Sequence, residues 1–402
     1  MAPAGSNSAS SNAPLTHVHS FGLAGQCRNN VGFIDEGICY YPVGHNVAIY
    51  HTDSREQELI PGCNQPPIVS EKITSLAISP NRRLLAVGEK CTNENGVVNI
   101  YDSQTLRRRK MLNYADMGSP EILHICFSND SKLCLTTGGA PDFTLVLWNV
   151  EKAVKVITTI KLATPSGNAV YRADFCPTDP TVISVTGNGI LRFFRIVENS
   201  FRPISLNIKR EPQNYVSQCW LPDDRIVVAT SSGELMIIEN FEFKCILSCS
   251  PGDGKSTGSI VSYSKGFVVG GNDEQIRIYE HSDDSREFYK LSKVFTIKQP
   301  SKATTSTSTA AITNMAVSPS EDTLLVSTSD YQLWTFGLSN TDILKEDGNN
   351  FDLLMSSFHS PGKGGSAQIS GIDTCIWKPL VVTCGLDCSV RVWNYQEKSL
   401  EL

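Results

Sequence analysis

The sequence predicts an all-β fold built from repeated sheets. A turn residue followed six positions later by an aromatic or large apolar residue recurs eight times in the 402 residues. The stretches between them alternate apolar with polar residues, which is typical of half-buried strands, and helical periodicity is almost absent. The repeats end at Tyr50, Tyr101, Trp148, Phe194, Ile238, Tyr279, Phe336 and Trp393.

A second signature precedes most of these repeat ends. An apolar strand runs into a turn with Pro or Asp, and a second apolar strand follows, as in ITSLAISPNRRLLAVG (73–88) and ITNMAVSPSEDTLLVSTSD (312–330). Each repeat therefore supplies three or four short strands, the pattern of WD40 repeats. One four-stranded sheet cannot bury both of its faces, but blades stacked around an axis cover one another. We expect a β-propeller of seven or eight four-stranded blades over residues 15–402. Eight repeats could close one ring, or seven could close it and leave one for a second ring.

An aspartate stands in the hairpin before the third strand of four repeats. A carboxylate there can hold a tight turn by accepting a hydrogen bond from its own backbone. We expect this structural role for Asp142, Asp273, Asp330 and Asp387.

Three segments do not follow the strand pattern. The first fourteen residues are small and polar, which predicts a disordered tail. The segment Lys298–Ala310 is rich in Ser and Thr, and residues 340–370 contain KEDGNN and SPGKGGS. We expect both to be loops.

Composition and charge exclude several classes of protein. A net charge of −6 and a pI near 5.7 argue against a nucleic-acid binder. No uncharged apolar run reaches the roughly 18 residues of a membrane span, and the N-terminus lacks the features of a secretory signal. Thirteen cysteines cannot all pair within the chain, which favours a reducing compartment such as the cytoplasm.

The sequence offers few candidates for chemistry. PGDGKSTGS (251–259) resembles a phosphate-binding loop, but Cys249 replaces a required glycine and a strand, not a helix, is expected to follow. His17 and His19 alternate, and Cys384 and Cys388 lie close, yet neither pair has the companions of a metal site. We therefore expect no catalytic residues, no cofactor, no metal and no small-molecule substrate. An active site built from distant residues stays open.

The one dense basic run is Arg107, Arg108, Arg109 and Lys110. It falls where the outer strand of a blade should begin. Charged side chains protect such an edge from pairing with another chain. The same run could instead contact an acidic partner, and the sequence leaves both interpretations open.

Several segments resemble a known family. HSFGLAGQCRNN (19–30) is similar to the opening segment of tandem-propeller proteins, including the echinoderm-microtubule-associated-like group. The rest resembles the N-terminal half of the cilia- and flagella-associated protein 57 family. The segments that carry this resemblance are AISPNRRLLAVGE (77–89), REPQNYV (210–216), SYSKGFVV (262–269), SPSEDTLLVSTSDYQL (318–333) and CIWKPLVVTCGLDCSVRVWNYQEKSLEL (375–402).

The resemblance implies a non-catalytic scaffold of the ciliary axoneme. Its expected partners are dynein-arm and doublet-microtubule proteins, its expected role supports inner dynein arm assembly and ciliary motility, and its expected location is the cytoplasm, the cytoskeleton and the cilium axoneme. Members of the family continue with further repeats, so we expect this chain to be the N-terminal part of a longer tandem-propeller protein. A cytoplasmic tandem-propeller protein that binds microtubules or actin is the alternative.

The two ends of the propeller region carry one further expectation. LTHVHSFGL (15–23) has no preceding strand to pair with, and little chain follows Trp393. We expect LTHVHSFGL to lie against the C-terminal blade or to fill the gap beside it, so that the ring is latched by its two ends.

Overall fold

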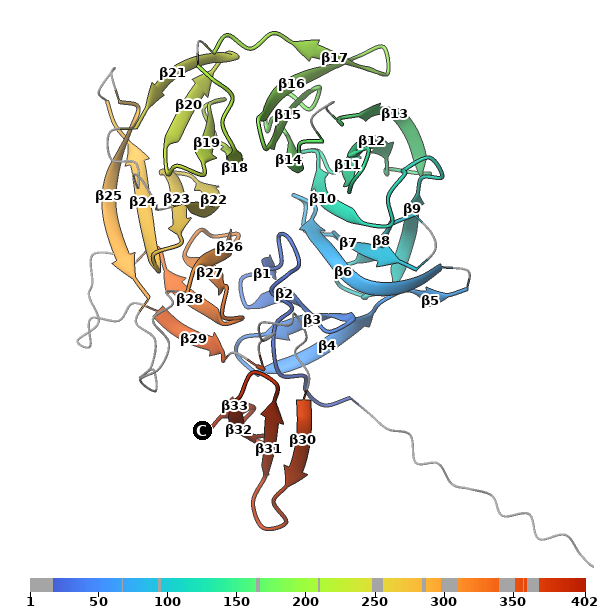
Figure 1. Cartoon of the computed structure of the whole chain (residues 1–402), viewed down its shortest axis with the longest axis vertical. Helices are drawn as coiled ribbons and strands as arrows, with labels where there is room; N and C mark the ends of the chain where they lie inside the picture. Colours follow the sequence, from blue (N-terminus) through green and yellow to red (C-terminus); the bar gives the residue numbers. More distant parts are fainter. Residues whose placement is uncertain are drawn as a thin grey trace, which may run out of the picture.

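The computed structural model describes residues 17–402 apart from 67, 93–94, 164–166, 209, 248–255, 284–286, 298–309, 340–350, 357 and 360–368. In this described part every regular element is a strand. The strands form antiparallel sheets, seven of which stand around a central axis while an eighth lies outside them (Figure 1).

The strands run in chain order from the inner to the outer edge of each sheet. The first three sheets comprise β1 (Gly32–Asp35), β2 (Ile38–Val43), β3 (Asn46–His51) and β4 (Glu56–Pro61); β5 (Asn64–Gln65), β6 (Ile68–Ile78), β7 (Leu84–Cys91), β8 (Val97–Asp102) and β9 (Arg108–Asn113); and β10 (Ile122–Phe127), β11 (Leu133–Gly138), β12 (Thr144–Asn149) and β13 (Lys155–Lys161). The next three comprise β14 (Val170–Phe175), β15 (Val182–Gly187), β16 (Ile190–Val197) and β17 (Ser200–Ile204); β18 (Tyr215–Trp220), β19 (Ile226–Thr230), β20 (Leu235–Glu239) and β21 (Glu242–Ile246); and β22 (Thr257–Tyr263), β23 (Gly266–Gly271), β24 (Gln275–His281) and β25 (Tyr289–Thr296). The last two comprise β26 (Ile312–Val317), β27 (Thr323–Thr328), β28 (Leu333–Gly337) and β29 (Phe351–Met355); and β30 (Ile369–Thr374), β31 (Leu380–Gly385), β32 (Val390–Asn394) and β33 (Ser399–Leu400).

Seven blades close the ring. Their inner strands contact one another in sequence, and β1 of the first blade completes the circle beside β26 of the seventh. Each interface between neighbouring blades holds its own cluster of buried apolar side chains. The closing cluster joins Phe33 and Tyr41 of the first blade to Leu325 and Leu333 of the seventh. Burying one side chain of this size contributes about 1.5–3 kcal/mol to folding. The closing interface therefore has the same kind of apolar stabilisation as the other six.

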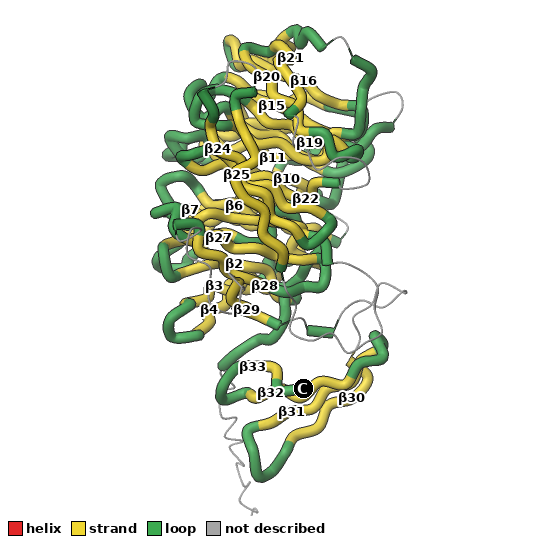
Figure 2. Tube along the Cα trace, turned by 90° about the vertical axis from the view of Figure 1, so that its left-hand side faces the viewer, coloured by secondary structure: helices red, strands yellow, loops and turns green. Residues whose placement is uncertain are grey.

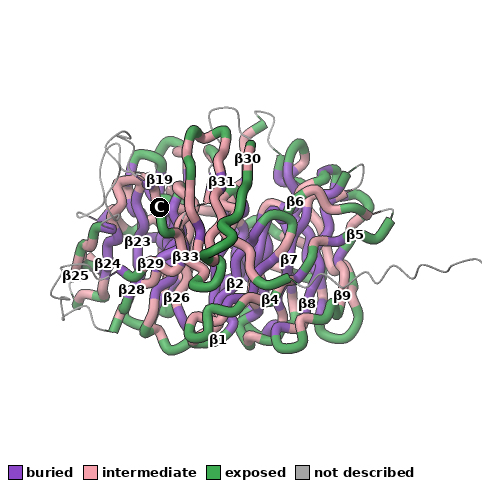
Figure 3. Tube along the Cα trace, turned by 90° about the horizontal axis from the view of Figure 1, so that it is seen from below, coloured by how far each residue is buried: buried purple, intermediate pink, exposed green. Residues whose placement is uncertain are grey.

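The eighth sheet, β30–β33, stands apart from the ring (Figures 1 and 2). None of its described residues belongs to the seven clusters of the ring. Seen from below, it is mostly half-buried or exposed, whereas the strands of the ring are mostly buried (Figure 3). Its main anchor is Trp393, which is 2% exposed and packs against Phe21 and Phe358 at ring-centroid distances of 4.8 and 5.1 Å.

The predicted repeat ends all fall on the third long strand of a sheet. They lie on β3, β8, β12, β16, β20, β24, β28 and β32. The sequence identified the repeats because turn chemistry and strand alternation recur in each one. It could not count the blades in the ring, since this depends on which apolar faces meet.

The predicted latch is wrong as a mechanism of closure, although the two ends do meet. Phe21 lies against Trp393, so the N-terminal segment contacts the C-terminal sheet as expected. The ring nevertheless closes through β1 and β26, without the eighth sheet. Residues 15 and 16 of the predicted segment lie outside the described residues.

One predicted loop, residues 340–370, needs correction, and the other is hardly tested. Residues 340–370 contain β29, the outer strand of the seventh blade, and the first two residues of β30. Phe351 is held there because its ring packs against Phe336 at 4.9 Å. Of Lys298–Ala310, only Ala310 is described; it is 1% exposed, and its N–H donates to Glu274 Oε1 at 2.8 Å. The predicted disordered tail, residues 1–14, lies outside the described residues.

Candidate interaction surfaces

The basic run begins at the outer strand of the second blade, where the sequence placed it. Arg109 pairs with Asp102 at 2.8 Å, and Arg108 donates to Gln65 Oε1 at 2.7 Å. The ammonium of Lys110 donates to the backbone carbonyls of Val150 and Glu151 in the next blade. Much of the run therefore serves the fold, and its role as a contact for an acidic partner stays a prediction.

The four predicted turn aspartates lie in the hairpins before the third strands. Asp273 Oδ1 accepts from Gln275 N at 3.4 Å, and the carboxylate also pairs with Arg277. Asp142 is different, because its carboxylate binds Lys161 Nζ at 2.6 Å on the neighbouring strand. Asp330 lies in the turn between β27 and β28.

Asp387 belongs to a buried network in the eighth sheet. Its Oδ1 accepts from Ser389 N at 3.3 Å and lies 2.9 Å from His359 Nδ1. His359 Nε2 in turn lies 2.8 Å from Thr383 Oγ1, which accepts a hydrogen bond from Trp393 Nε1 at 2.9 Å. Since a carboxylate accepts, Nδ1 carries the ring proton, and Thr383 donates to Nε2. The network joins two strand connections, the one between β29 and β30 that holds His359 and the turn between β31 and β32, to Thr383 on β31 and Trp393 on β32.

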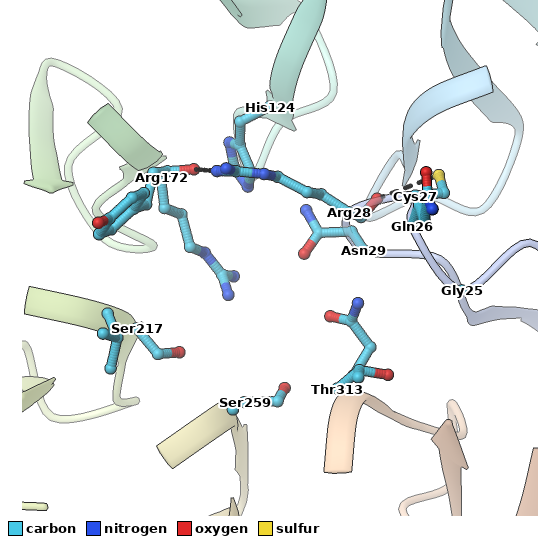
Figure 4. A pocket seen from close by; sticks show the side chains of 14 residues that line it. Gly25, Gln26, Cys27, Arg28, Asn29, His124, Arg172, Ser217, Ser259 and Thr313 are labelled. Carbon is cyan, nitrogen blue, oxygen red and sulfur yellow. Dashed lines mark hydrogen bonds between the residues drawn. The ribbon is translucent and has the colours of Figure 1, made fainter. Parts of the chain in front are cut away.

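A ring of polar side chains lines one mouth of the central channel. In β6, β10, β14, β18, β22 and β26, the pairing with the next strand shifts register near the start of the inner strand. The residue that follows each shift is polar; these residues are Ser75, His124, Arg172, Ser217, Ser259 and Asn314. All except Ser75 line a cavity of about 370 Å³ (Figure 4). The bulge turns one side chain of each blade toward the axis.

The N-terminal segment adds a second arginine to this mouth. The backbone of Arg28 pairs with β6, donating to Thr74 O at 3.0 Å. Its side chain then reaches across to the fourth blade, where Nη1 donates to Tyr171 O at 2.9 Å. Burial lowers the pKa of Arg28, although the nearby Glu121 charge acts in the opposite direction. Even so, a guanidinium remains protonated in proteins.

Arg172 is the other cation of the mouth, and Asp174 is its counterion. Arg172 Nε donates to Asp174 Oδ2 at 2.6 Å, and Gln218 Nε2 donates to the same oxygen at 2.9 Å. Burial, the largest single effect, would raise the pKa of Asp174, but the charges and hydrogen bonds of its neighbours, Arg172 first, together outweigh it, and the pKa is lowered. His124 lies 3.7 Å from Asp174 Oδ1, yet burial lowers its pKa to about 4. The imidazole is therefore neutral at physiological pH.

Sequence reasoning missed this mouth. The signal was present as a triplet at the start of the inner strands, in which an apolar residue is followed two positions later by a polar one. The triplets are ITS (73–75), ILH (122–124), VYR (170–172), YVS (215–217) and ITN (312–314). Alternation alone assigns both residues to the same face, so the bulge that separates them is visible only in three dimensions.

The eighth sheet carries most of the large apolar side chains that the described structure exposes. Ile376 and Trp377, in the turn after β30, are 90% and 91% exposed, and Ile372 and Val390 are 70% and 63% exposed. Exposed apolar surface of this extent marks an interaction site.

The remaining sequence candidates lie elsewhere. Residues 251–255 of the phosphate-loop-like segment fall outside the described residues, and the strand β22 follows it where the sequence predicted a strand. His17 is exposed and bonds Ser20, whereas His19 packs against Phe21. Cys384 lies in β31, and Cys388 occupies an exposed turn with φ of 59°.

The described residues contain no group of three or more His, Cys, Asp or Glu side chains arranged to hold a metal ion. They also contain no helix whose length and hydropathy would let it cross a membrane.

Comparison with known proteins identifies the family. The family model "WD domain, G-beta repeat" matches residues 357–394, which include the network around Asp387. The chain is 32% identical to cilia- and flagella-associated protein 57 of Mus musculus over 96% of its length. It belongs to the cilia- and flagella-associated protein 57 family. It is also 26% identical to cilia- and flagella-associated protein 57 A of Tetrahymena thermophila, over 91% of its length.

The match covers only part of these relatives. The chain spans 33% of the mouse protein and 31% of the Tetrahymena protein. Among solved structures, the β-propeller domain of Cps50 (Swd1) from Myceliophteria thermophila superimposes with a TM-score of 0.56 at 15% identity. That match covers 80% of this chain and 96% of the Cps50 chain, and it supports the propeller fold alone.

Proposed function

We propose that this chain is a non-catalytic interaction platform of the ciliary axoneme that supports inner dynein arm assembly and thereby ciliary motility. The observation that carries the proposal is family membership over nearly the whole chain, since the curated relatives are named for their association with cilia and flagella. WD40 propellers act by presenting rigid surfaces to protein partners, and this chain offers several such surfaces.

The eighth sheet carries an apolar surface of the kind that neighbouring blades cover inside the ring. Its Ile372, Trp377 and Val390 are exposed. We propose that this sheet is a blade of a second propeller in the full-length protein, as the resemblance implies. The partners would then contact two rings in tandem, and dynein-arm and doublet-microtubule proteins are the expected candidates.

Tagging the full-length protein at its own locus tests the proposal. We expect the tag in cilia and, after membranes are removed with detergent, in the axoneme pellet together with inner-arm dynein subunits. A tag confined to the cell body that co-sediments with cytoplasmic microtubules or actin would contradict the proposal and favour the tandem-propeller alternative.

A further inference from the structure

The mouth of the central channel holds a guanidinium whose hydrogen-bonding capacity is only partly used. The Nε–H of Arg172 donates a hydrogen bond to Asp174. In the described structure neither of its terminal nitrogens has a hydrogen-bond partner, and Figure 4 shows them in the open centre of the cavity. A guanidinium presents these donors as a rigid fork that matches a carboxylate.

Arg28 brings a second positive charge to the same cavity. Its one side-chain hydrogen bond in the described structure goes to the neutral carbonyl of Tyr171, and no carboxylate lies within ion-pair distance. The mouth therefore contains two arginine charges against the directly paired charge of Asp174 and the more distant charge of Glu121. Withdrawing a cation from water without an adjacent counterion is unfavourable, so a bound anion would stabilise this arrangement.

Neutral donors around the cavity provide an independent indication of a ligand. His124 is 3% exposed, and neither of its ring nitrogens has a hydrogen-bond partner in the described part of the chain. Ser217 and Ser259, on two further blades, are buried residues that line the same cavity. Buried polar groups are normally satisfied, so the unpaired ring nitrogens of His124 among these polar residues indicate a ligand.

We propose that this mouth binds a carboxylate from an extended, acidic segment of a protein partner. The fork of Arg172 would take the two oxygens, Arg28 would add a second positive charge, and His124 would donate its single N–H. A cavity of about 370 Å³ admits the tip of a side chain or a chain end but no folded element. The chain as a whole carries a net charge of −6, so attraction of an anion must be local to these two arginines.

The inference rests on the proposed scaffold function, because it assigns one class of partner to the platform. It is tested by binding in solution, which is independent of where the protein resides. Failure to bind carboxylates would leave the ciliary localisation standing, and failure of the localisation would leave the binding site standing.

The experiment titrates the whole chain with three short peptides while arginine side-chain NMR signals are followed. The first is a blocked glycine peptide with one central glutamate, the second has glutamine in its place, and the third is a glycine peptide with a free C-terminal carboxylate. We expect the glutamate or the free-carboxylate peptide to bind with a Kd of about 1 mM, as suits a single small group. The tighter of the two identifies the source of the carboxylate. The glutamine peptide should not bind.

Three variants locate the binding. Arg172→Gln and Arg28→Gln should each weaken it by about tenfold or more, as expected for loss of one partner from a charged contact. Arg202→Gln, on an exposed outer strand, should leave the Kd unchanged. Melting curves check that each variant is folded. If Arg172→Gln unfolds because Asp174 loses its partner, Arg28→Gln still tests the site, since Arg28 has no such partner. Failure of both carboxylate peptides to bind more tightly than the glutamine peptide, or binding that survives both channel variants, would overturn the proposal.

Discussion

Thr383 is the side chain on which the buried network of the eighth sheet converges. Its hydroxyl accepts from Trp393 Nε1 at 2.9 Å and donates to His359 Nε2 at 2.8 Å. Thr383→Val keeps the shape of the side chain but removes both hydrogen bonds. The indole N–H and the ring nitrogen are then left without partners, while Trp393 and His359 remain 2% and 4% exposed.

The cost follows from the two groups that lose their partners. Leaving a buried polar group unsatisfied costs about 1–3 kcal/mol, so the variant should lose about 2–6 kcal/mol of local stability. A single small sheet has little stability of its own. We therefore expect the eighth sheet of Thr383→Val to open locally while the seven-bladed ring stays folded.

Hydrogen exchange resolved by peptide measures this directly. Amides of β31 and β32 should exchange about thirtyfold faster or more, since each 1.4 kcal/mol corresponds to a factor of ten. Amides of β19, deep in the ring, should not change. Thr374→Val is the matched control, because Thr374 lies exposed on β30 of the same sheet. Unchanged exchange in β31 and β32, or equal loss of protection in the ring, would refute the reasoning.

Three other predictions concern the ring and its junctions. His124 takes up a proton near pH 6.5 when unfolded but only near pH 4 when folded, so wild-type stability should fall by about 3 kcal/mol as pH drops through this window. Urea unfolding should show a smaller loss for His124→Gln, and identical pH profiles would contradict the buried neutral imidazole. Replacing residues 299–309 with a short Gly/Ser link should leave the melting temperature within a few degrees of the wild-type value. Extending the replacement through Ala310 should lower the melting temperature, because Ala310 is buried and its N–H is hydrogen-bonded. Equal melting temperatures for the two variants would show that Ala310 contributes nothing to stability. Phe21→Ala should raise protease cleavage within the eighth sheet without changing the far side of the ring, since Phe21 packs on Trp393; unchanged cleavage would mean that this contact does not hold the sheet.

Local chemistry made much of the fold predictable. The turn residue lies before the third long strand of every sheet, and the aromatic or large apolar residue six positions later lies on that strand, because both are fixed by the hairpin itself. Segments with weaker alternation were missed, such as Phe351–Met355, whose strand is held by packing against Phe336 and not by turn chemistry.

The candidate binding mouth was beyond prediction from the sequence for a different reason. Arg28 lies 143 positions before Tyr171, the residue that precedes Arg172. Only closure of the ring brings the two arginines to one cavity. The basic run 107–110 was conspicuous in the sequence because its charges are adjacent, yet several of them are engaged in contacts within the fold. Adjacency of charge along a chain is thus a weak guide to where free donors gather in space.

The proposed axonemal role is tested most directly by cryo-electron tomography of axonemes from cells that lack the full-length protein. Inner dynein arm density should be reduced at defined positions along the doublets, and re-expression of the wild-type protein should restore it. Complete inner arms and normal beating in the absence of the protein would contradict the account.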